Sequence, residues 1–149
     1  MKIIHIHKKI LPKVLQEIGI LLRYGGVIVY PTDTAYALGG IFDNTKVIKK
    51  ILQIKKRKDT KFTIIASGMS QVEKFFSLNT FEKKLAKKYW PGPLSIVVSK
   101  KYAVRVPNDA RARDLARVAR RPLIATSANI SGKDSPLSIR EFLQQHKKN

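Results

Sequence analysis

Short β-prone runs alternate with segments of helical periodicity along this chain of 149 residues, and this alternation limits its fold more than any other feature. Apolar side chains spaced three and four residues apart predict amphipathic helices, and compact runs of Ile, Val and Phe predict strands. The expected strands cover 3–7, 27–30, 62–66, 94–98, 102–106 and 122–125, and the expected helices cover 10–24, 45–54, 70–76, 80–89, 109–120 and 138–145.

This pattern favours an α/β fold, with a twisted, mixed and largely open sheet flanked by helices. The runs at 94–98 and 102–106 are separated by only a few residues, so we expect them to form a hairpin. The chain length and the lack of a linker-like tract predict a single domain over 1–149. The residues expected to begin or end helices are the stretch Asp43-Asn44-Thr45, Ser70, Ser138 and Gly25.

The charge balance is strongly basic, with 30 Lys and Arg against 10 Asp and Glu and a formal net charge of +20. Such an excess favours polyanionic partners such as nucleic acid or nucleotide phosphates. The alternative is a set of lysines solvated on helix faces, because the aromatic residues are scattered and no RNA-recognition signature is present. The charge therefore permits binding of RNA without defining a site for it.

Composition also limits the chemistry. The absence of Cys excludes disulfides and thiolate catalysis, and fits a reducing compartment. No run resembles a signal peptide or approaches the length of a membrane span, so a cytoplasmic protein is expected. His5 and His7 would share a face of the first strand, but the scarcity of other ligands favours no metal site. Any Mg²⁺ is expected to arrive with a nucleotide, since acidic residues are few.

The glycine-bounded stretch 25–40, GGVIVYPTDTAYALGG, is the first candidate for a binding site. Its apolar run is expected to end at Pro31, which has no N–H for a sheet. Thr32, Asp33 and Thr34 would then form an exposed, hydroxyl-rich turn at the strand end, where open α/β sheets bind small polar ligands. The alternative is an ordinary turn that uses these residues only for local hydrogen bonds.

A second strand exit follows 122–125, where the sequence TSANISG presents Ser127 and Asn129 two residues apart. These two side chains could contact one ligand from a loop, or they could form a local Ser or Asx turn. No Walker A sequence, GxGxxG sequence or Cys/His cluster accompanies either exit.

Three cations are candidates for binding anions. Lys55 and Arg57 lie at the end of an expected helix, where they could bind phosphate. Taken alone, a solvated helix end is the better interpretation of this basic run. Arg105 lies inside an apolar strand, and burying a charge there is costly unless it is paired. Either that strand has one wet face or Arg105 is directed at an anion such as a substrate carboxylate, and the second interpretation is favoured.

Five motifs together resemble the YrdC-type threonylcarbamoyl-AMP synthases, in residue type and in order. They are YPTDT at 30–34, K-x-R at Lys55 and Arg57, WPGPL at 90–94, VRVP at 104–107 and SAN-x-SG at 127–132. The chain departs from the family pattern at Ala35 and Ala37 in place of Val and Gly, and at Lys58 in place of a proline. The connection before VRVP is also short. A closing C-terminal stretch with an STV-type motif is missing, so the chain is C-terminally short relative to the family.

The resemblance implies a nucleotidyltransferase that converts ATP, L-threonine and bicarbonate to threonylcarbamoyl-AMP and pyrophosphate, for N6-threonylcarbamoyladenosine at position 37 of tRNA. It implies that Thr32, Arg105 and Ala125 bind L-threonine. The residues implied for ATP are Lys55, Arg57, Ser127, Asn129 and Ser135, with Lys55 and Arg57 as the catalytic cations.

The implied partners are tRNA or double-stranded RNA and the transferase machinery that receives the adenylate, with no membrane. One alternative is a non-catalytic YrdC-like protein that binds nucleotide or RNA. A YciO-like paralogue of different activity is another, against which the intact Lys55/Arg57 and Ser127/Asn129 pairs argue.

Overall fold

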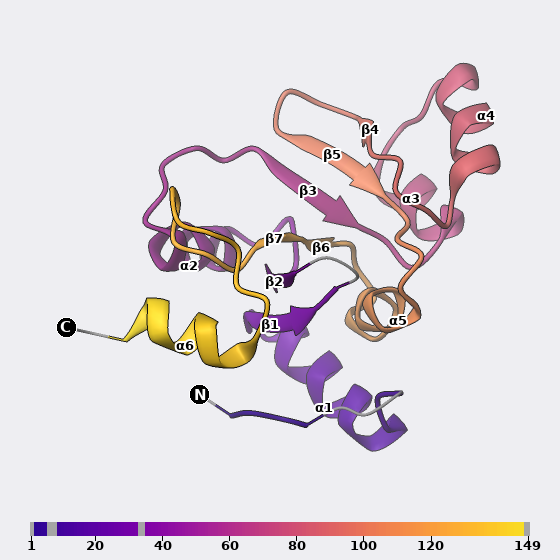
Figure 1. The fold of residues 1–149 in the computed structure, drawn as a ribbon. Helices are drawn as coiled ribbons and strands as arrows, with labels where there is room; N and C mark the ends of the chain where they lie inside the picture. The colour runs from indigo at the N-terminus through magenta and orange to yellow at the C-terminus, as the bar shows by residue number, and fades with distance from the viewer. Residues whose placement is uncertain (1, 6–8, 33–34, 148–149) are drawn as a thin grey trace.

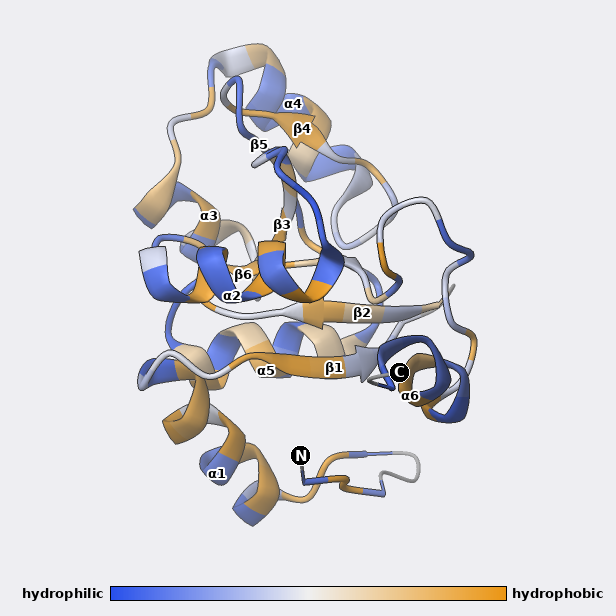
Figure 2. Ribbon diagram, turned by 90° about the vertical axis from the view of Figure 1, so that its left-hand side faces the viewer, coloured by the Kyte–Doolittle hydropathy of each residue, from blue (hydrophilic) through white to orange (hydrophobic). Residues whose placement is uncertain are grey.

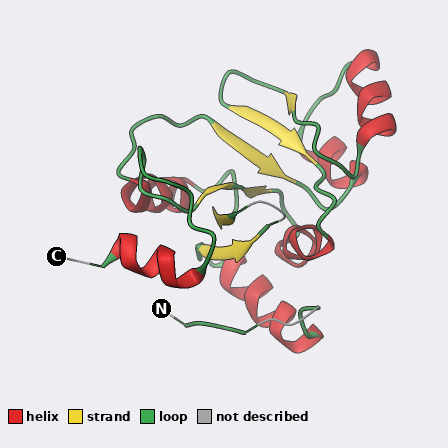
Figure 3. Cartoon of the chain, viewed as in Figure 1, coloured by secondary structure: helices red, strands yellow, loops and turns green. Residues whose placement is uncertain are grey.

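The computed structural model describes residues 2–5, 9–32 and 35–147, and it has the expected α/β architecture (Figure 1). Helices surround the strands on several sides (Figure 3). The elements in chain order are α1 Pro12–Arg23, β1 Ile28–Pro31, β2 Tyr36–Gly39, α2 Thr45–Lys55, β3 Phe62–Ile65, α3 Met69–Phe75, α4 Thr80–Tyr89, β4 Ile96–Val97, β5 Tyr102–Arg105, α5 Ala110–Ala119, β6 Leu123–Ile124, β7 Thr126–Ser127 and α6 Ile139–His146.

The strands form two hydrogen-bonded sheets. One is antiparallel and has the order β1-β2-β7, and the other has the order β4-β5-β3-β6. In the second sheet β3 and β5 are parallel, whereas β4–β5 and β3–β6 are antiparallel. The expected mixed, open arrangement is confirmed, including the hairpin of β4 and β5.

The two sheets are joined by the segment that carries β6 and β7. Ala125, between these strands, donates its N–H to the carbonyl of Thr63 at 2.8 Å, so it stays against β3. The next two residues pair with β2 instead, where Thr126 lies opposite Leu38. The chain therefore passes from one sheet to the other at Ala125, and this junction brings the ends of both sheets together.

Apolar clusters cover both faces of the second sheet. Ile64 belongs to a cluster shared with α2, α3 and α4, whereas its neighbour Ile65 belongs to a cluster shared with α1 and α5. Because neighbouring strand residues point to opposite faces, these clusters lie on opposite sides. Figure 2 shows that the strands are mostly hydrophobic, whereas α6 is largely hydrophilic.

Local signals placed several elements correctly. Asn44 caps α2 by accepting from the N–H groups of Lys46 and Val47, and Ser138 caps α6 by accepting from the N–H of Glu141. Gly25 follows α1 with a φ of 82°, a left-handed conformation that suits glycine at a helix end.

Three local predictions were wrong. Residues 3–5 form no strand, and the rest of that expected strand, with His7, lies outside the described residues. The helix expected to begin at Ser70 begins at Met69 behind Gly68, without a side-chain cap. The strand expected over 94–98 is reduced to Ile96–Val97.

The prediction that the strand ends at Pro31 is confirmed, although Pro31 itself still belongs to the strand. Pro31 is the last residue of β1 and lies opposite Tyr36. β1 pairs only with β2 among the described strands, and an edge position tolerates a missing N–H. The following YALG, which had no predicted strand, is the central strand of its sheet. Thr32 is half-buried rather than exposed, and Asp33 and Thr34 lie outside the described residues.

None of the helices in the described part of the chain has the length and apolar character needed to cross a bilayer.

Candidate active site

A cavity of about 160 Å³ lies where the ends of the two sheets meet. Its wall is formed by the end of β1, by Thr32 and Ala35, and by the start of β2, the end of β5, the first turn of α5 and the junction at 125–127. Pockets for drug-sized ligands usually measure about 300–1,000 Å³. This cavity is smaller and suits a ligand of the size of an amino acid.

The cavity gathers residues that sequence reasoning had named from distant parts of the chain. Thr32, Arg105 and Ala125, which the resemblance implies for L-threonine, all line it. Ser127 and Ser135, implied for ATP, line it as well. The two strand exits, which the sequence showed only as separate loops, therefore form one site.

Arg105 supplies the cavity with a cation whose hydrogen bonds are incomplete. It is the last residue of β5 and is half-buried, and its Nε is buried with no hydrogen-bond partner in the described part of the chain. A buried donor without an acceptor costs about 1–3 kcal/mol. An anionic ligand in the cavity would supply the missing acceptor, which fits the interpretation that Arg105 faces an anion.

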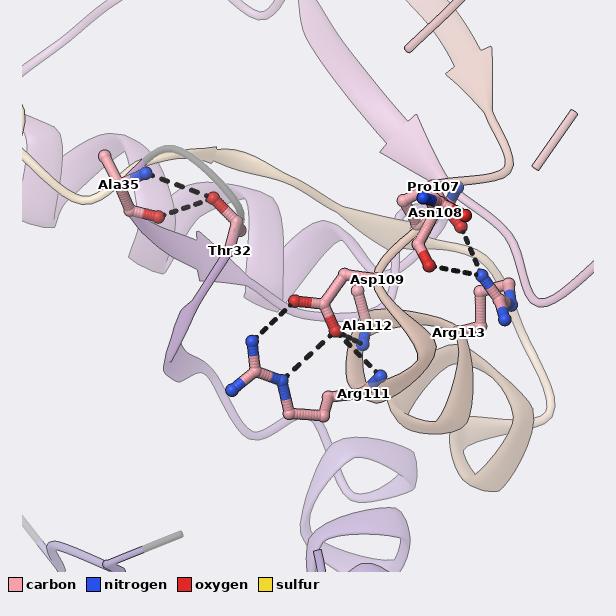
Figure 4. Close-up of polar contacts among 8 residues, drawn as sticks. All are labelled: Thr32, Ala35, Pro107, Asn108, Asp109, Arg111, Ala112 and Arg113. Carbon is pink, nitrogen blue, oxygen red and sulfur yellow. Dashed lines mark hydrogen bonds and ion pairs between the residues drawn. The ribbon is translucent and has the colours of Figure 1, made fainter. Parts of the chain in front are cut away.

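Asp109 brings a carboxylate to the cavity, but this charge is already compensated. Asp109 caps α5 and accepts from the backbone N–H of Arg111 at 2.8 Å, and its Oδ2 accepts from the Arg111 guanidinium at 2.8 Å (Figure 4). Burial raises the pKa of Asp109, but these hydrogen bonds outweigh burial and hold the pKa below its ordinary value. Asp109 is therefore ionised and engaged by Arg111 rather than by Arg105.

The loop that follows Arg105 is fixed by a second arginine. Arg113 donates to the carbonyls of Pro107 and Asn108, both at 2.8 Å (Figure 4). These bonds hold the connection between β5 and α5, and so the spacing between Arg105 and Asp109.

Thr32 closes the turn beside the cavity. Its hydroxyl donates to the carbonyl of Ala35 at 2.6 Å and accepts from the N–H of Ala35 at 3.2 Å (Figure 4). The threonine thus shapes the wall through a local turn, which agrees with the turn chemistry expected as one of two interpretations.

Lys55 is neither solvated nor on the cavity wall. It is only 3% exposed, and its ammonium donates to the carbonyl of Ser127, to the carbonyl of Asn129 at 3.1 Å and to the side-chain oxygen of Asn129 at 3.4 Å. Its own carbonyl accepts from the N–H of Ser131 at 2.9 Å. Burial, and to a lesser degree the charge of Arg57, lowers the pKa of Lys55 to about 8. Lys55 ties the end of α2 to the SAN segment, and the interpretation as a solvated helix end was wrong for it.

Arg57 lies on the loop between α2 and β3. Its Nε donates to the carbonyl of Asp59 at 2.8 Å, and its guanidinium also bonds the carbonyl of Lys61 and covers the ring of Phe62, 5.0 Å from the ring centre. The side chain of Asn129 likewise points into its own loop, where it donates to the carbonyl of Lys133 at 2.6 Å. In this structure Lys55, Arg57 and Asn129 therefore lie outside the cavity wall.

Sequence reasoning gave no role to several further residues of the wall, among them Tyr30 and Asp109. A signal existed for both. Tyr30 precedes Thr32 by two residues, so a strand that places one at the site places the other on the same face. Asp109 is the N-cap that follows the strand carrying Arg105. The described residues contain no cluster of three His, Cys, Asp or Glu that could hold a metal ion.

Comparison with known proteins agrees with this fold. Residues 20–149 match the family model described as telomere recombination and named for Sua5, YciO and YrdC. The chain is 32% identical over 153 residues to a protein of Methanocaldococcus jannaschii named "Putative threonylcarbamoyl-AMP synthase", and the match covers 95% of this chain and 72% of that protein.

Two solved structures share the fold. The complex of P. abyssi Sua5 with L-threonine has a TM-score of 0.81 and 30% identity, over 93% of this chain and 45% of that chain. E. coli YciO has a TM-score of 0.72 and 24% identity, over 90% of this chain and 74% of that chain. The chain spans less than half the length of the Sua5 chains. Because the family model matches most of its residues, the chain belongs to the Sua5/YciO/YrdC family.

Proposed function

We propose that this protein is an L-threonylcarbamoyladenylate synthase. The observation that carries the proposal is Arg105, whose buried Nε has no hydrogen-bond partner among the described residues, in a cavity of amino-acid size beside a carboxylate that Arg111 already neutralises. The name of the M. jannaschii relative supports the reaction, and the L-threonine in the P. abyssi Sua5 complex supports the substrate.

In this proposal L-threonine binds with its carboxylate on the Arg105 guanidinium, which can form two parallel hydrogen bonds with it. Thr32 and the backbone of Ala125 line the same cavity and orient the rest of the molecule. The amine is then directed away from Arg105, toward the exposed Ser127 and Ser135, where the nucleotide would bind.

The chemistry proceeds in two balanced steps. The amine attacks bicarbonate to give a carbamate and water. A carbamate oxygen then forms a bond to the α-phosphorus of ATP while the bond from that phosphorus to the bridging oxygen breaks, so pyrophosphate leaves. No covalent intermediate with the enzyme is required, and the rate would come from alignment of the substrates and from cations that stabilise phosphoryl charge. We expect Mg²⁺ to accompany the nucleotide.

The cations implied for ATP have different tasks in this proposal. Lys55 acts through the carbonyls of Ser127 and Asn129 as a positioning residue. Arg57 would reach phosphate by exchanging the carbonyls of Asp59 and Lys61 for phosphate oxygens, a change that its 22% exposed side chain permits. The product would pass, in the cytoplasm, to the transferase machinery that modifies tRNA.

A non-catalytic RNA-binding role is the second candidate, and the basic surface favours it. Exposed lysines crowd the outer side of α4, among them Lys83, Lys84, Lys87 and Lys88. Binding through phosphate contacts predicts an affinity for double-stranded RNA or tRNA that falls steeply with salt.

The experiment that separates these functions is release of pyrophosphate from ATP, with and without L-threonine and bicarbonate. Release that requires both supports the synthase, and Arg105→Ala should reduce it at least 100-fold. Arg117→Ala is the matched control, since Arg117 pairs with Asp114 on the exposed side of α5. No release from folded protein overturns the synthase, and salt-sensitive RNA binding would then support the second candidate.

A further inference from the structure

Tyr30 places a buried hydroxyl without a partner at the cavity. The residue is 5% exposed and lines the cavity from β1. Its hydroxyl oxygen is buried and has no hydrogen-bond partner among the described residues. A buried polar group left in this state costs free energy comparable to a lost hydrogen bond, and native proteins keep few of them.

The hydroxyl of Tyr30 is a proton donor at any ordinary pH. Burial raises its pKa well above the usual range, although the nearby positive charge of Arg105 opposes this and Asp109 adds to it. The same cavity wall holds the second buried donor without a partner, Nε of Arg105. Two residues of one cavity wall, Tyr30 and Arg105, therefore each have a buried donor without a partner among the described residues. A ligand with acceptor oxygens would satisfy both donors.

The acceptors already present do not meet this need. Asp109 is the carboxylate on the wall, and its oxygens accept from the backbone and guanidinium of Arg111 and from the N–H of Ala112. Its acceptor capacity is therefore largely used on α5. An anionic oxygen brought by a ligand would complete the hydrogen bonding of both Tyr30 and Arg105.

The Tyr30 ring is held in place by close contact with a neighbouring strand. A Cβ built on Gly39 would lie 3.0 Å from Cε1 of Tyr30 and 2.5 Å from the carbonyl oxygen of Ile124. A side chain at residue 39 would therefore clash with the backbone of Ile124 and would also press on the ring. The ring also forms part of the wall of a second, mostly apolar cavity of about 480 Å³ beneath β1, so it lies between the two cavities.

We propose that the Tyr30 hydroxyl donates a hydrogen bond to the ligand carboxylate that pairs with Arg105, which makes Tyr30 a binding residue of this site. The inference rests on the proposed function in taking the ligand to be L-threonine. The hydroxyl is covered in the free protein, so a small shift of the wall accompanies binding. The unpaired donors of the free protein then become paired.

The test is Tyr30→Phe, which removes only the hydroxyl, with Tyr102→Phe as the control. Tyr102 is a partly buried strand tyrosine that packs on Phe42, 5.7 Å between ring centres, and does not line the cavity. We expect Tyr30→Phe to bind L-threonine about ten-fold more weakly by calorimetry, which corresponds to about 1.4 kcal/mol. Its melting temperature without ligand should equal or exceed that of the wild type, because an unpaired buried group has been removed.

L-threoninol, which lacks the carboxylate, identifies the atom that is recognised. Its affinity should be the same for wild type and Tyr30→Phe. Equal L-threonine affinity in both proteins, or an equal loss for threoninol, would overturn the role of Tyr30 while leaving the synthase proposal intact. If the wild type binds no L-threonine, the proposed function fails first, and this inference fails with it. Should Tyr30→Phe not fold, Tyr30→Met provides a second apolar side chain without a donor, for the same comparison.

Discussion

Replacement of Lys55 with methionine tests how the site is held together. The Lys55 ammonium is buried against the oxygens of Ser127 and Asn129, and Ser127 lines the cavity. Methionine keeps an unbranched apolar stem but removes both the donor and the charge. We expect a change in the pH dependence of stability and, because the SAN segment loses its tie, a loss of pyrophosphate release.

The magnitude follows from the pKa of Lys55, which burial and then the charge of Arg57 lower from 10.5 to about 8. Between these values the unfolded chain binds more protons than the folded chain, so the free energy of unfolding rises with pH. The difference between 10.5 and about 8, at about 1.36 kcal/mol for each pH unit, gives a rise of up to about 3 kcal/mol. Below about pH 8 Lys55 is protonated in both states and contributes no pH dependence.

Urea unfolding at about pH 7.5 and about pH 10.5 measures this effect. The wild type should gain stability between the two conditions relative to Lys55→Met, since the variant lacks the titrating group. Lys50→Met, on the exposed side of the same helix, is the control for loss of one lysine from a highly basic chain. If wild type and Lys55→Met show the same change with pH, the argument from burial of Lys55 is refuted.

Two further predictions concern the walls of the cavity. Gly39→Ala would place a Cβ 2.5 Å from the carbonyl oxygen of Ile124, so we expect a loss of about 1–3 kcal/mol in urea unfolding, whereas Gly68→Ala, where a Cβ meets nothing within 4 Å, should change little. Burial raises the pKa of Asp109, but hydrogen bonds from its arginine partner outweigh burial, so its stabilising contribution is present above the ordinary pKa of about 3.9 and is lost as the pH falls through the lowered value. Asp109→Asn keeps the helix cap but should unfold with less pH dependence than wild type below about pH 4. Equal acid profiles for Asp109→Asn and wild type would contradict this.

The elements that the sequence predicted best are those with local causes. The helix Thr80–Tyr89 was predicted to the residue, because its apolar residues are spaced for one helix face and Pro91 prevents its continuation. The structure adds a capping box at Asn79, which fixes the start of the helix. The strand Tyr36–Gly39 was missed, since Ala and Gly give it little β propensity of its own. Its structure comes from pairing with β1 on one edge and β7 on the other, and β7 is distant in sequence.

The site shows the same division between local and distant causes. The sequence identified Arg105 because a charge inside an apolar strand is unusual, and the cavity agrees with that argument. It treated Lys55 as one of a run of surface cations, although a helical signal was present. Val47, Ile51 and Lys55 are spaced four apart and are the buried residues of α2. That spacing predicts the inner face of the helix. It cannot show that three acceptor oxygens of Ser127 and Asn129 lie next to the Lys55 ammonium.

The balance of charge around the cavity argues for the orientation of an amino-acid ligand. Arg105 brings one positive charge, and Asp109 brings one negative charge that Arg111 compensates. Among the described residues the wall therefore has one cation in excess, together with the hydroxyl of Tyr30, which has no hydrogen-bond partner among them. A carboxylate is stabilised at this end, whereas an ammonium group would meet Arg105 at close range. The amine of the ligand is thus favoured on the side of the carboxylate that faces away from Arg105, where the proposed reaction with bicarbonate and then ATP can take place.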